Sequence, residues 1–370
     1  MSRMTDVVII GSGAIGGAVA LALAGRGLSV TVVDSGRLGR GATWAAAGVL
    51  EPEVGHHNPP ALTTLASESL ALWPDWAAEL QERSGVALHF RRDGLLNVWA
   101  DPDAPALPSE VAVEPPPMGP GCERLSADEA RRLEPALSGP IAGAVLDPAA
   151  CQVDNTRLAP ALVRAGADLG VRFLPGTPVV ALARSGERCT GVVLSDGSTL
   201  SAGAVVVAAG AWSGSLGASI GVRLPVEPWR GQMLTFEAVD RPVRRIVFCG
   251  EMVLIPRPHG PLIVGTTLER VGFDARVTFS GLAQILARAA CLAPGLGSLP
   301  LARTWAGLRP GTPDGLPYLG PVPGVPGLFA ATGHGRKGII LAPITGELVA
   351  EAVMTGSDVG IAEGLRPGRG

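Results

Sequence analysis

Apolar residues near the start of the chain are grouped as a β-α-β unit requires. Val7–Ile10 is an uninterrupted apolar run, typical of a buried parallel strand, and Ser29–Val33 predicts a second one. Between them, Gly17–Arg26 is rich in small residues and predicts a helix that packs closely on both strands. This order predicts an α/β fold with a parallel sheet.

Glycines at the turn of this unit predict a dinucleotide site. Gly11, Gly13 and Gly16 form the pattern G-x-G-x-x-G. The first glycine permits a tight turn, the second lets the backbone approach a pyrophosphate, and the third lets helix and strand pack closely; free N–H groups at the helix start bind the phosphate charge. Asp34 follows about twenty residues later, where a carboxylate accepts hydrogen bonds from ribose hydroxyls. A purely structural glycine turn would leave Asp34 unexplained.

Small residues later in the chain favour a flat ring as the rest of the ligand. The glycine pattern alone does not separate flavin from nicotinamide, because both cofactors present the same ADP half. Arg40–Leu50 is too rich in small residues for an ordinary amphipathic helix and suits close backbone approach to a ring. Further strands are predicted at Thr177–Val179 and Val205–Trp212.

Alternating apolar and polar positions predict a second sheet. Val86–Trp99 and Arg244–Thr267 alternate in this way, with turns at residues 92–94 and 256–261. Such a pattern is typical of antiparallel strands with one covered face.

Two helices and two loops complete the predicted elements. The helices cover residues 279–292 and run from near residue 338 to 353; the positive end of the second helix dipole would face an anionic ring. The proline-dense segment 101–121 predicts a surface loop, and residues 305–320 predict a turn-rich loop around Arg309.

The composition narrows the class of protein. The 370 residues are 47% hydrophobic and carry a net charge of −3, without the basic excess that binding to nucleic acid or an anionic membrane needs. Val7–Gly25 lacks charge, but its glycines and its continuation into a strand argue against a signal peptide or membrane span. Five cysteines without a C-x-x-C pair indicate a reducing, cytoplasmic setting. Neither they nor the adjacent His56 and His57 form a metal-site pattern, so no metal is predicted.

The order of motifs along the chain resembles the FAD-dependent D-amino acid oxidase superfamily. After the β-α-β fingerprint come A-A-A-G at residues 45–48, V-V-A-A-G-A-W-S at 206–213, R-P-G-T-P-D-G at 309–315 and G-H-G-R-K-G-I-I-L-A-P at 333–343. Within the superfamily, the chain most resembles thiamine-pathway glycine oxidases, over nearly its whole length.

The resemblance implies two interleaved domains. An α/β FAD-binding domain, Rossmann-like and of the glutathione-reductase type, would comprise residues 1–85, 146–215 and 306–365. An α+β substrate-binding domain with an antiparallel sheet would comprise residues 86–145 and 216–305. The loop around Arg309 holds no cysteine, where sarcosine oxidases attach their flavin, so FAD should be bound non-covalently.

The resemblance also implies which residues bind FAD. They belong to the glycine turn and the acid after it, the small-residue segment, two later strands, and the turn before the last helix. These residues are Gly11, Gly13, Ala14, Ile15, Gly16, Asp34, Ser35, Ala42, Thr43, Ala47, Gly48, Val49, Val179, Gly210, His334, Gly335, Arg336, Lys337, Gly338, Ile339 and Ile340.

Four residues are predicted to meet the substrate: Arg309, Arg336, Lys337 and Val253. A planar guanidinium suits a carboxylate because it makes two parallel charge-assisted bonds, and the glycine oxidase arginine that matches Arg309 binds the substrate carboxylate. A surface arginine or a structural ion pair is the alternative. The match of Arg336 lies beside flavin and substrate, although this side chain could equally hold the flavin carbonyls or pair with a carboxylate elsewhere.

Two departures from glycine oxidases concern the choice of substrate. Lys337 replaces the usual asparagine, and G-H-G-x-K is closer to monomeric sarcosine oxidase, whose lysine helps to bind the substrate carboxylate. Val253 stands where a tyrosine is usual, next to Glu251 where histidine is frequent, and the missing hydroxyl removes a hydrogen bond worth about 1.5 to 3 kcal/mol to a charged acceptor. Either Lys337 compensates, or the pocket is wider and more apolar, with Leu268 also lining it.

These features imply an FAD-dependent oxidase. It would convert glycine, sarcosine or a small D-amino acid to the oxo acid, with release of ammonia or amine and hydrogen peroxide. The resemblance implies a place in thiamine (thiazole) biosynthesis. A D-amino acid dehydrogenase with another electron acceptor and a non-catalytic FAD-binding partner are the alternatives. The expected partners are a small amino acid or amine and molecular oxygen, without nucleic acid or membrane; homo-oligomer formation is left open.

Overall fold

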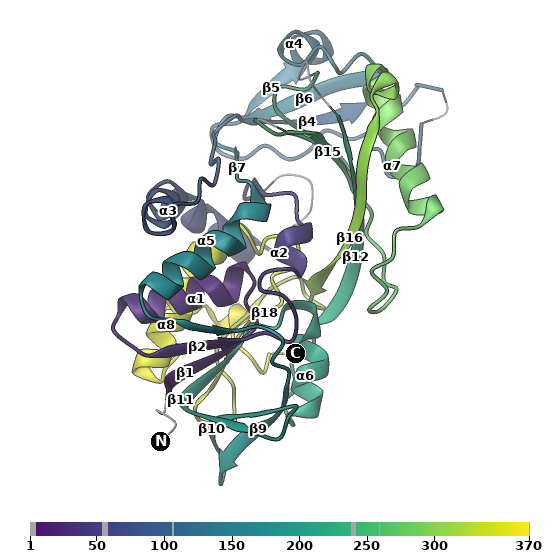
Figure 1. Cartoon of the computed structure of the whole chain (residues 1–370). Coiled ribbons are helices and arrows are strands. Elements are labelled where there is room, and N and C mark those ends of the chain that lie inside the picture. The colour runs from purple at the N-terminus through teal and green to yellow at the C-terminus, as the bar shows by residue number, and fades with distance from the viewer. Residues whose placement is uncertain (1–4, 54–57, 106, 238–241, 259, 370) are drawn as a thin grey trace.

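Two eight-stranded sheets organise the protein in the computed structural model, which describes residues 5–53, 58–105, 107–237, 242–258 and 260–369 (Figure 1). The first sheet contains, in spatial order, β17 (Tyr318–Pro321), β18 (Leu328–Thr332), β11 (Thr199–Val207), β1 (Thr5–Ile10), β2 (Val30–Val33) and β8 (Arg172–Leu174), with β10 (Arg188–Leu194) beside β11 and β9 (Val179–Ser185) beside β10. The second contains β16 (Leu301–Gly311), β12 (Glu227–Phe236), β15 (Leu262–Gly265), β14 (Met252–Pro256), β13 (Ile246–Cys249), β4 (Leu95–Ala100), β6 (Ile141–Asp147) and β5 (Glu123–Ser126). A separate short pair joins β3 (Val49–Leu50) to β7 (Cys151–Gln152).

Helices cover both sheets. In Figure 1, α1, α5 and α8 lie together on one side of the first sheet, and α7 lies against the second. The helices are α1 (Ala14–Gly25), α2 (Ala42–Ala45), α3 (Pro60–Ser84), α4 (Ala127–Leu133), α5 (Asn155–Asp168), α6 (Ser213–Ser219), α7 (Phe279–Leu292) and α8 (Ala342–Thr355), with short 3₁₀ turns at Gly210–Trp212, Pro294–Ser298 and Glu363–Leu365.

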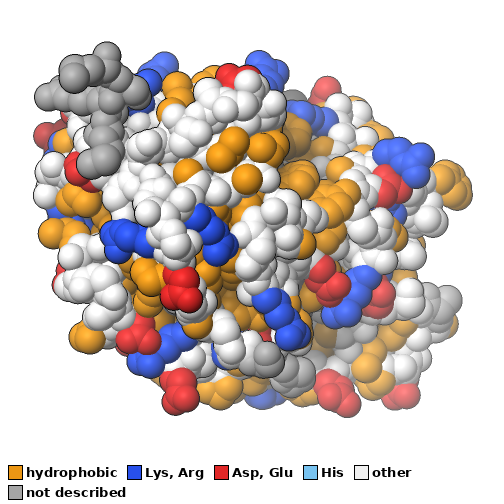
Figure 2. All heavy atoms as spheres, turned by 90° about the horizontal axis from the view of Figure 1, so that it is seen from below, with side chains coloured by type: hydrophobic (Ala, Val, Ile, Leu, Met, Phe, Trp, Pro, Cys, Tyr) orange, Lys and Arg blue, Asp and Glu red, His pale blue; other side chains and the backbone are white. Residues whose placement is uncertain are grey.

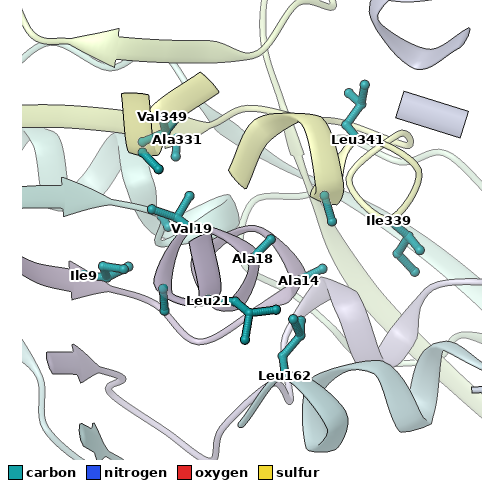
Figure 3. Packing of buried hydrophobic residues seen from close by; sticks show 14 of the residues in the cluster. Ile9, Ala14, Ala18, Val19, Leu21, Leu162, Ala331, Ile339, Leu341 and Val349 are labelled. Atoms are coloured by element: carbon teal, nitrogen blue, oxygen red, sulfur yellow. The ribbon is translucent and has the colours of Figure 1, made fainter. Parts of the chain in front are cut away.

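The predicted β-α-β unit is confirmed. β1 pairs in parallel with β2 on one side and with β11 on the other, and β18 continues the parallel order beyond β11. Ile9 on β1, Val19 on α1 and Val349 on α8 belong to one buried apolar cluster, which Figure 3 shows between these elements. Burial of this apolar surface holds the first and last parts of the fold together.

The second sheet is mixed rather than purely antiparallel. Its strands run antiparallel except for β13, which pairs in parallel with β4. β4 begins only at Leu95, although the alternation of apolar and polar residues begins at Val86. The predicted helix at residues 279–292 is confirmed as α7, where Ile285 packs into the cluster that contains Leu254 of β14.

Arg309 lies on a strand, so the predicted turn-rich loop is wrong for residues 305–311 and is confined to residues 312–317. β16 pairs with β12 along its whole length, with Arg309 opposite Trp229. Glycine and proline suggested a loop, but β16 is the edge strand of its sheet, where Pro310 can lack an N–H without losing a ladder bond. The bare Cα of Gly311 lies against the Trp229 ring, which leaves no room for a Cβ.

The last helix begins later than predicted. Residues 338–341 form a turn in which the Leu341 N–H donates to the Lys337 carbonyl (3.0 Å), and the regular helix starts at Ala342. Pro343 explains this start because its fixed φ and missing N–H suit the first turn of a helix.

The expected division into two domains stays a prediction. All eight strands of the first sheet come from residues 1–85, 146–215 and 306–365, whereas β6 and β16 of the second sheet cross the expected boundaries at 146 and 306. Basic and acidic side chains are interspersed on the face in Figure 2. Within the described ranges, every helix is too short or too polar to cross a membrane.

Candidate active site

A cavity of about 700 Å³ lies where the two sheets meet. Its wall includes nearly every residue that the sequence predicted for cofactor or substrate, from the glycine turn to Arg309 and the 334–339 turn. Gly16 and Ile340 are the exceptions: both are buried behind the wall. One connected space therefore joins the predicted nucleotide end to the predicted substrate end.

Close packing at the glycine turn explains two of its glycines. Gly11 adopts φ +107°, and a Cβ added there would lie 2.3 Å from the Ala208 carbonyl oxygen on the neighbouring strand. A Cβ on Gly16 would lie 1.9 Å from the Gly11 carbonyl oxygen. Gly13 precedes α1 and has no side chain to cap it, so the positive end of the helix dipole lies at the cavity wall, where it suits an anion.

Asp34 is held at the end of β2 by three hydrogen bonds. Its Oδ2 accepts from the N–H and the hydroxyl of Ser12 (2.9 and 2.5 Å), and its Oδ1 accepts from the Gly36 N–H (2.9 Å). The carboxylate lines the cavity beside the glycine turn. Thr43 also contributes, because its Oγ1 accepts from the Ala14 N–H (2.8 Å). The geometry fits a ribose and pyrophosphate at this end.

A partly buried arginine holds the small-residue segment in place. Arg257 donates to the Ala47 carbonyl (2.9 Å), the Asn155 side chain (2.7 Å) and the Val153 carbonyl (2.9 Å). Gly48 adopts φ +72° and passes so close to Val153 that a Cβ would lie 2.1 Å from its oxygen. Burial lowers the pKa of Arg257 to about 10, so the side chain stays charged at neutral pH. The sequence did not single out this role.

Arg309 presents its guanidinium to the cavity at the other end. Its Nη1 donates to the Thr267 carbonyl (3.1 Å) and its Nη2 to the Thr266 hydroxyl (2.8 Å). No carboxylate among the described residues forms an ion pair with it. Burial, the larger cause, and the charge of Arg336 lower the pKa of Arg309 to about 10, while Glu251 opposes the shift. Arg309 is therefore a charged, partly desolvated donor that no acid in the described part of the chain pairs.

The two other cations predicted to meet the substrate, Arg336 and Lys337, are paired. Nη2 of Arg336 lies 2.9 Å from both carboxylate oxygens of Glu251. The Lys337 ammonium donates to the Glu51 carbonyl (2.8 Å) and also bonds the Glu51 carboxylate, and both side chains are buried. Lys337 thus lies at the cavity, but its ammonium is already engaged by an acid that the sequence did not single out.

Apolar residues and one glycine shape the wall near Arg309. Val253 and Met233 line the cavity, whereas Leu268 does not and is 45% exposed, so its predicted place in the wall is wrong. Gly231, on the strand paired with β16, was not predicted; a Cβ there would lie 2.1 Å from Nη1 of Arg309. A glycine pattern gives no sign of such a role, because the side chain that needs the space comes from residue 309.

His334 is a buried, neutral member of the cavity wall. It is 3% exposed, its Nε2 lies 3.1 Å from the Thr345 hydroxyl, and burial lowers the pKa of His334 to about 3. In the unfolded chain, the pKa would be near 6.5. The unfolded state therefore takes up a proton first as the pH falls, which disfavours folding.

We expect this group to make the protein less stable below about pH 6. His334 leaves the free energy of unfolding unchanged above pH 6.5. Below that pH it lowers the free energy of unfolding by about 1.4 kcal/mol for each pH unit, down to about pH 3. Urea unfolding at pH 8, 6 and 5 of the natural protein and His334→Gln measures this, and the variant should show the shallower dependence. Equal slopes would contradict the neutral, buried state.

Metal ligands are not grouped in the described part of the chain: no three His, Cys, Asp or Glu side chains there could share an ion. His56 and His57 lie outside the described residues. The cavity wall instead offers a helix start, a ribose-facing acid and a strip of small residues, which fit a dinucleotide cofactor with a flat ring.

Comparisons with known proteins agree with this geometry. The family model described as FAD dependent oxidoreductase (DAO) matches residues 6–352. The chain is 37% identical to glycine oxidase of Geobacillus kaustophilus (95% of this chain, 94% of the relative) and 35% identical to hydrogen cyanide synthase subunit HcnC of Pseudomonas aeruginosa (94% and 92%). The crystal structure of glycine oxidase from Geobacillus kaustophilus superposes with a TM-score of 0.90 at 33% identity, covering 100% of both chains.

These matches confirm the resemblance that the motifs suggested. They also confirm the fold class, a Rossmann-like FAD-binding part with a second, substrate-side sheet, and FAD as the cofactor. More than half of the chain lies within the matched family model. The chain belongs to the DAO family of FAD-dependent oxidoreductases.

Proposed function

We propose that the protein oxidises glycine, sarcosine or a small D-amino acid. The amine is oxidised to an imine, water converts the imine to the oxo acid plus ammonia or amine, and oxygen is reduced to hydrogen peroxide. The observation that carries this proposal is the Arg309 guanidinium at the substrate end of the cavity, which no carboxylate of the described residues pairs. Similarity to glycine oxidase supports it, and we place the reaction in the cytoplasm, in the supply of the thiazole part of thiamine.

The charges around the cavity suit one carboxylate. Arg336 and Lys337 are each matched by an acid, so Arg309 alone among these cations lacks an anionic partner within the described residues. A substrate carboxylate would complete it with charge-assisted hydrogen bonds at low cost, because the guanidinium is already desolvated and fixed by Thr266 and Thr267. Val253 and Met233 would face the rest of a small substrate and keep water away from it.

The residues that would hold the cofactor form two groups. The glycine turn and Asp34 would hold the nucleotide half, and residues 42–49 with the 334–339 turn would surround the ring. FAD supplies the acceptor for the substrate hydride and the route of electrons to oxygen. The protein's own part is to orient the substrate α-carbon, which Arg309 does through the carboxylate.

A second candidate is a dehydrogenase that passes electrons to a partner instead of oxygen. Similarity to a protein named as a subunit of hydrogen cyanide synthase favours keeping it. The test is anaerobic bleaching of the purified yellow protein by glycine, sarcosine, D-alanine and D-proline, followed by air. Bleaching with fast reoxidation and peroxide supports the oxidase; bleaching with slow reoxidation supports the dehydrogenase. Failure of all four amines to bleach the flavin would overturn both.

Gly231→Ala is expected to raise the KM for the amino acid about tenfold to 100-fold. Its new methyl group would occupy the place of the Arg309 guanidinium, and displacement of a positioning group by about 1 Å can cost a factor of 100. The fold should survive, because the displaced atoms are the far end of a flexible side chain. Steady-state kinetics measure the change. Gly25→Ala, on the exposed end of α1 with nothing near the added Cβ, is the control and should leave the KM unchanged.

A further inference from the structure

Two consecutive cations in the 334–338 turn face acids from distant segments. Lys337 is paired with Glu51, which follows β3, and Arg336 with Glu251, in the turn between β13 and β14. The two ion pairs differ in position relative to Arg309. The Arg336–Glu251 pair acts electrostatically on Arg309: Arg336 lowers the pKa of Arg309 and Glu251 raises it.

Thr266 connects Glu251 to the proposed carboxylate site. The Thr266 N–H donates to the Glu251 carbonyl (2.9 Å), and the Thr266 hydroxyl accepts from Arg309 (2.8 Å). Glu251, Arg336 and Arg309 all line the same cavity. A substrate held by Arg309 would therefore lie beside Arg336, whose charge is balanced by the Glu251 carboxylate in the same cavity wall.

We propose that Glu251 is a specificity-determining residue that excludes substrates with a second carboxylate. This inference rests on the proposed function. A second acidic group directed at Arg336 would meet a cation whose charge is cancelled by Glu251 and would itself be repelled by that carboxylate. Like charges placed side by side cost several kcal/mol, so monocarboxylates are preferred. Glu251 acts by its charge, beside the substrate, and takes no part in the oxidation itself.

Glu251→Gln removes the charge at constant shape and is the direct test. The FAD-loaded protein is titrated with acetate as a monocarboxylate and with malonate and succinate as dicarboxylates, and dissociation constants are read from the flavin absorbance change without turnover. We expect the affinity for the better dicarboxylate, relative to acetate, to rise about tenfold or more in the variant. Glu251→Ala, measured in parallel, should change the ratio in the same direction if the glutamine variant does not fold.

Two further variants separate the explanations. Glu347→Gln breaks another partly exposed Arg–Glu pair, with Arg26, outside the cavity wall, and should leave the ratio of dicarboxylate to acetate affinity unchanged. In the double variant Glu251→Gln/Arg336→Gln, the rise in dicarboxylate affinity should disappear, because Arg336 is no longer there to bind the second carboxylate. If the affinity for dicarboxylates relative to acetate is unchanged in the Glu251 variants while acetate binding still depends on Arg309, this inference alone is overturned. Acetate binding that ignores Arg309→Met overturns the proposed carboxylate site, and the inference with it.

Discussion

Replacing Arg309 by methionine is expected to raise the KM for the amino acid about 100-fold while FAD stays bound. Truncating one partner of a buried charge pair costs about 2 to 5 kcal/mol, and each 1.4 kcal/mol is a factor of ten. Methionine keeps much of the volume but removes both donors. The free energy of unfolding should hardly fall, because a desolvated cation without an anionic partner contributes little to stability.

The control for this prediction is Arg303→Met on the same strand. Arg303 is exposed, lies 4.7 Å from the Trp44 ring and is outside the cavity wall. It should leave the KM unchanged. Flavin absorbance, thermal unfolding and steady-state kinetics of both variants are compared. A KM that is the same in Arg309→Met and the natural protein, for every amine that is oxidised, would remove Arg309 from the substrate site.

Gly11→Ala is expected to abolish most FAD binding and to lower the free energy of unfolding by about 3 kcal/mol or more. An alanine at φ +107° is strained, and its Cβ would lie 2.3 Å from the Ala208 carbonyl oxygen, so β1 and β11 would have to separate. The first N–H groups of α1 would move with the turn. Flavin content per protein after gel filtration and urea unfolding measure the two effects.

Gly25→Ala at the other end of α1 provides the comparison. Its added Cβ meets nothing within 4 Å, and alanine favours a helix, so flavin content should stay constant and stability should rise slightly. If Gly11→Ala retained full flavin content with unchanged unfolding, the close approach of the glycine turn to Ala208 would not matter for the cofactor.

The nucleotide end was predictable because its signals are local. Gly11, Gly16 and Asp34 lie within one β-α-β unit, so spacing along the chain translates directly into spacing in space. Helix α7 followed from apolar periodicity in the same way. Local signals misled at Arg309 because tertiary pairing prevailed: the glycines and prolines around it suggested a loop, and pairing with β12 made the segment a strand.

The substrate end was predictable only in part. Resemblance singled out Arg309, but the partners of Arg336 and Lys337 come from residues 251 and 51, far away in the sequence. Periodicity carries no information about such pairs, because each acid reads as an ordinary polar position. Gly231 was missed for a related reason: its small size matters to a side chain on another strand.

The first sheet is built from both ends of the described chain, and this sets the order of events during synthesis. β18 lies beside β11, and α8 packs in the same cluster as α1. More than 300 residues separate β1 from β18, which corresponds to roughly 15 to 60 s of translation at 5–20 residues per second. During that interval α1 lacks the part of its cover that α8 provides. Residues 331–339 of the cavity wall also emerge only at the end of it, so the complete FAD site forms late in synthesis, and a cell short of riboflavin should accumulate full-length apoprotein rather than nascent chains.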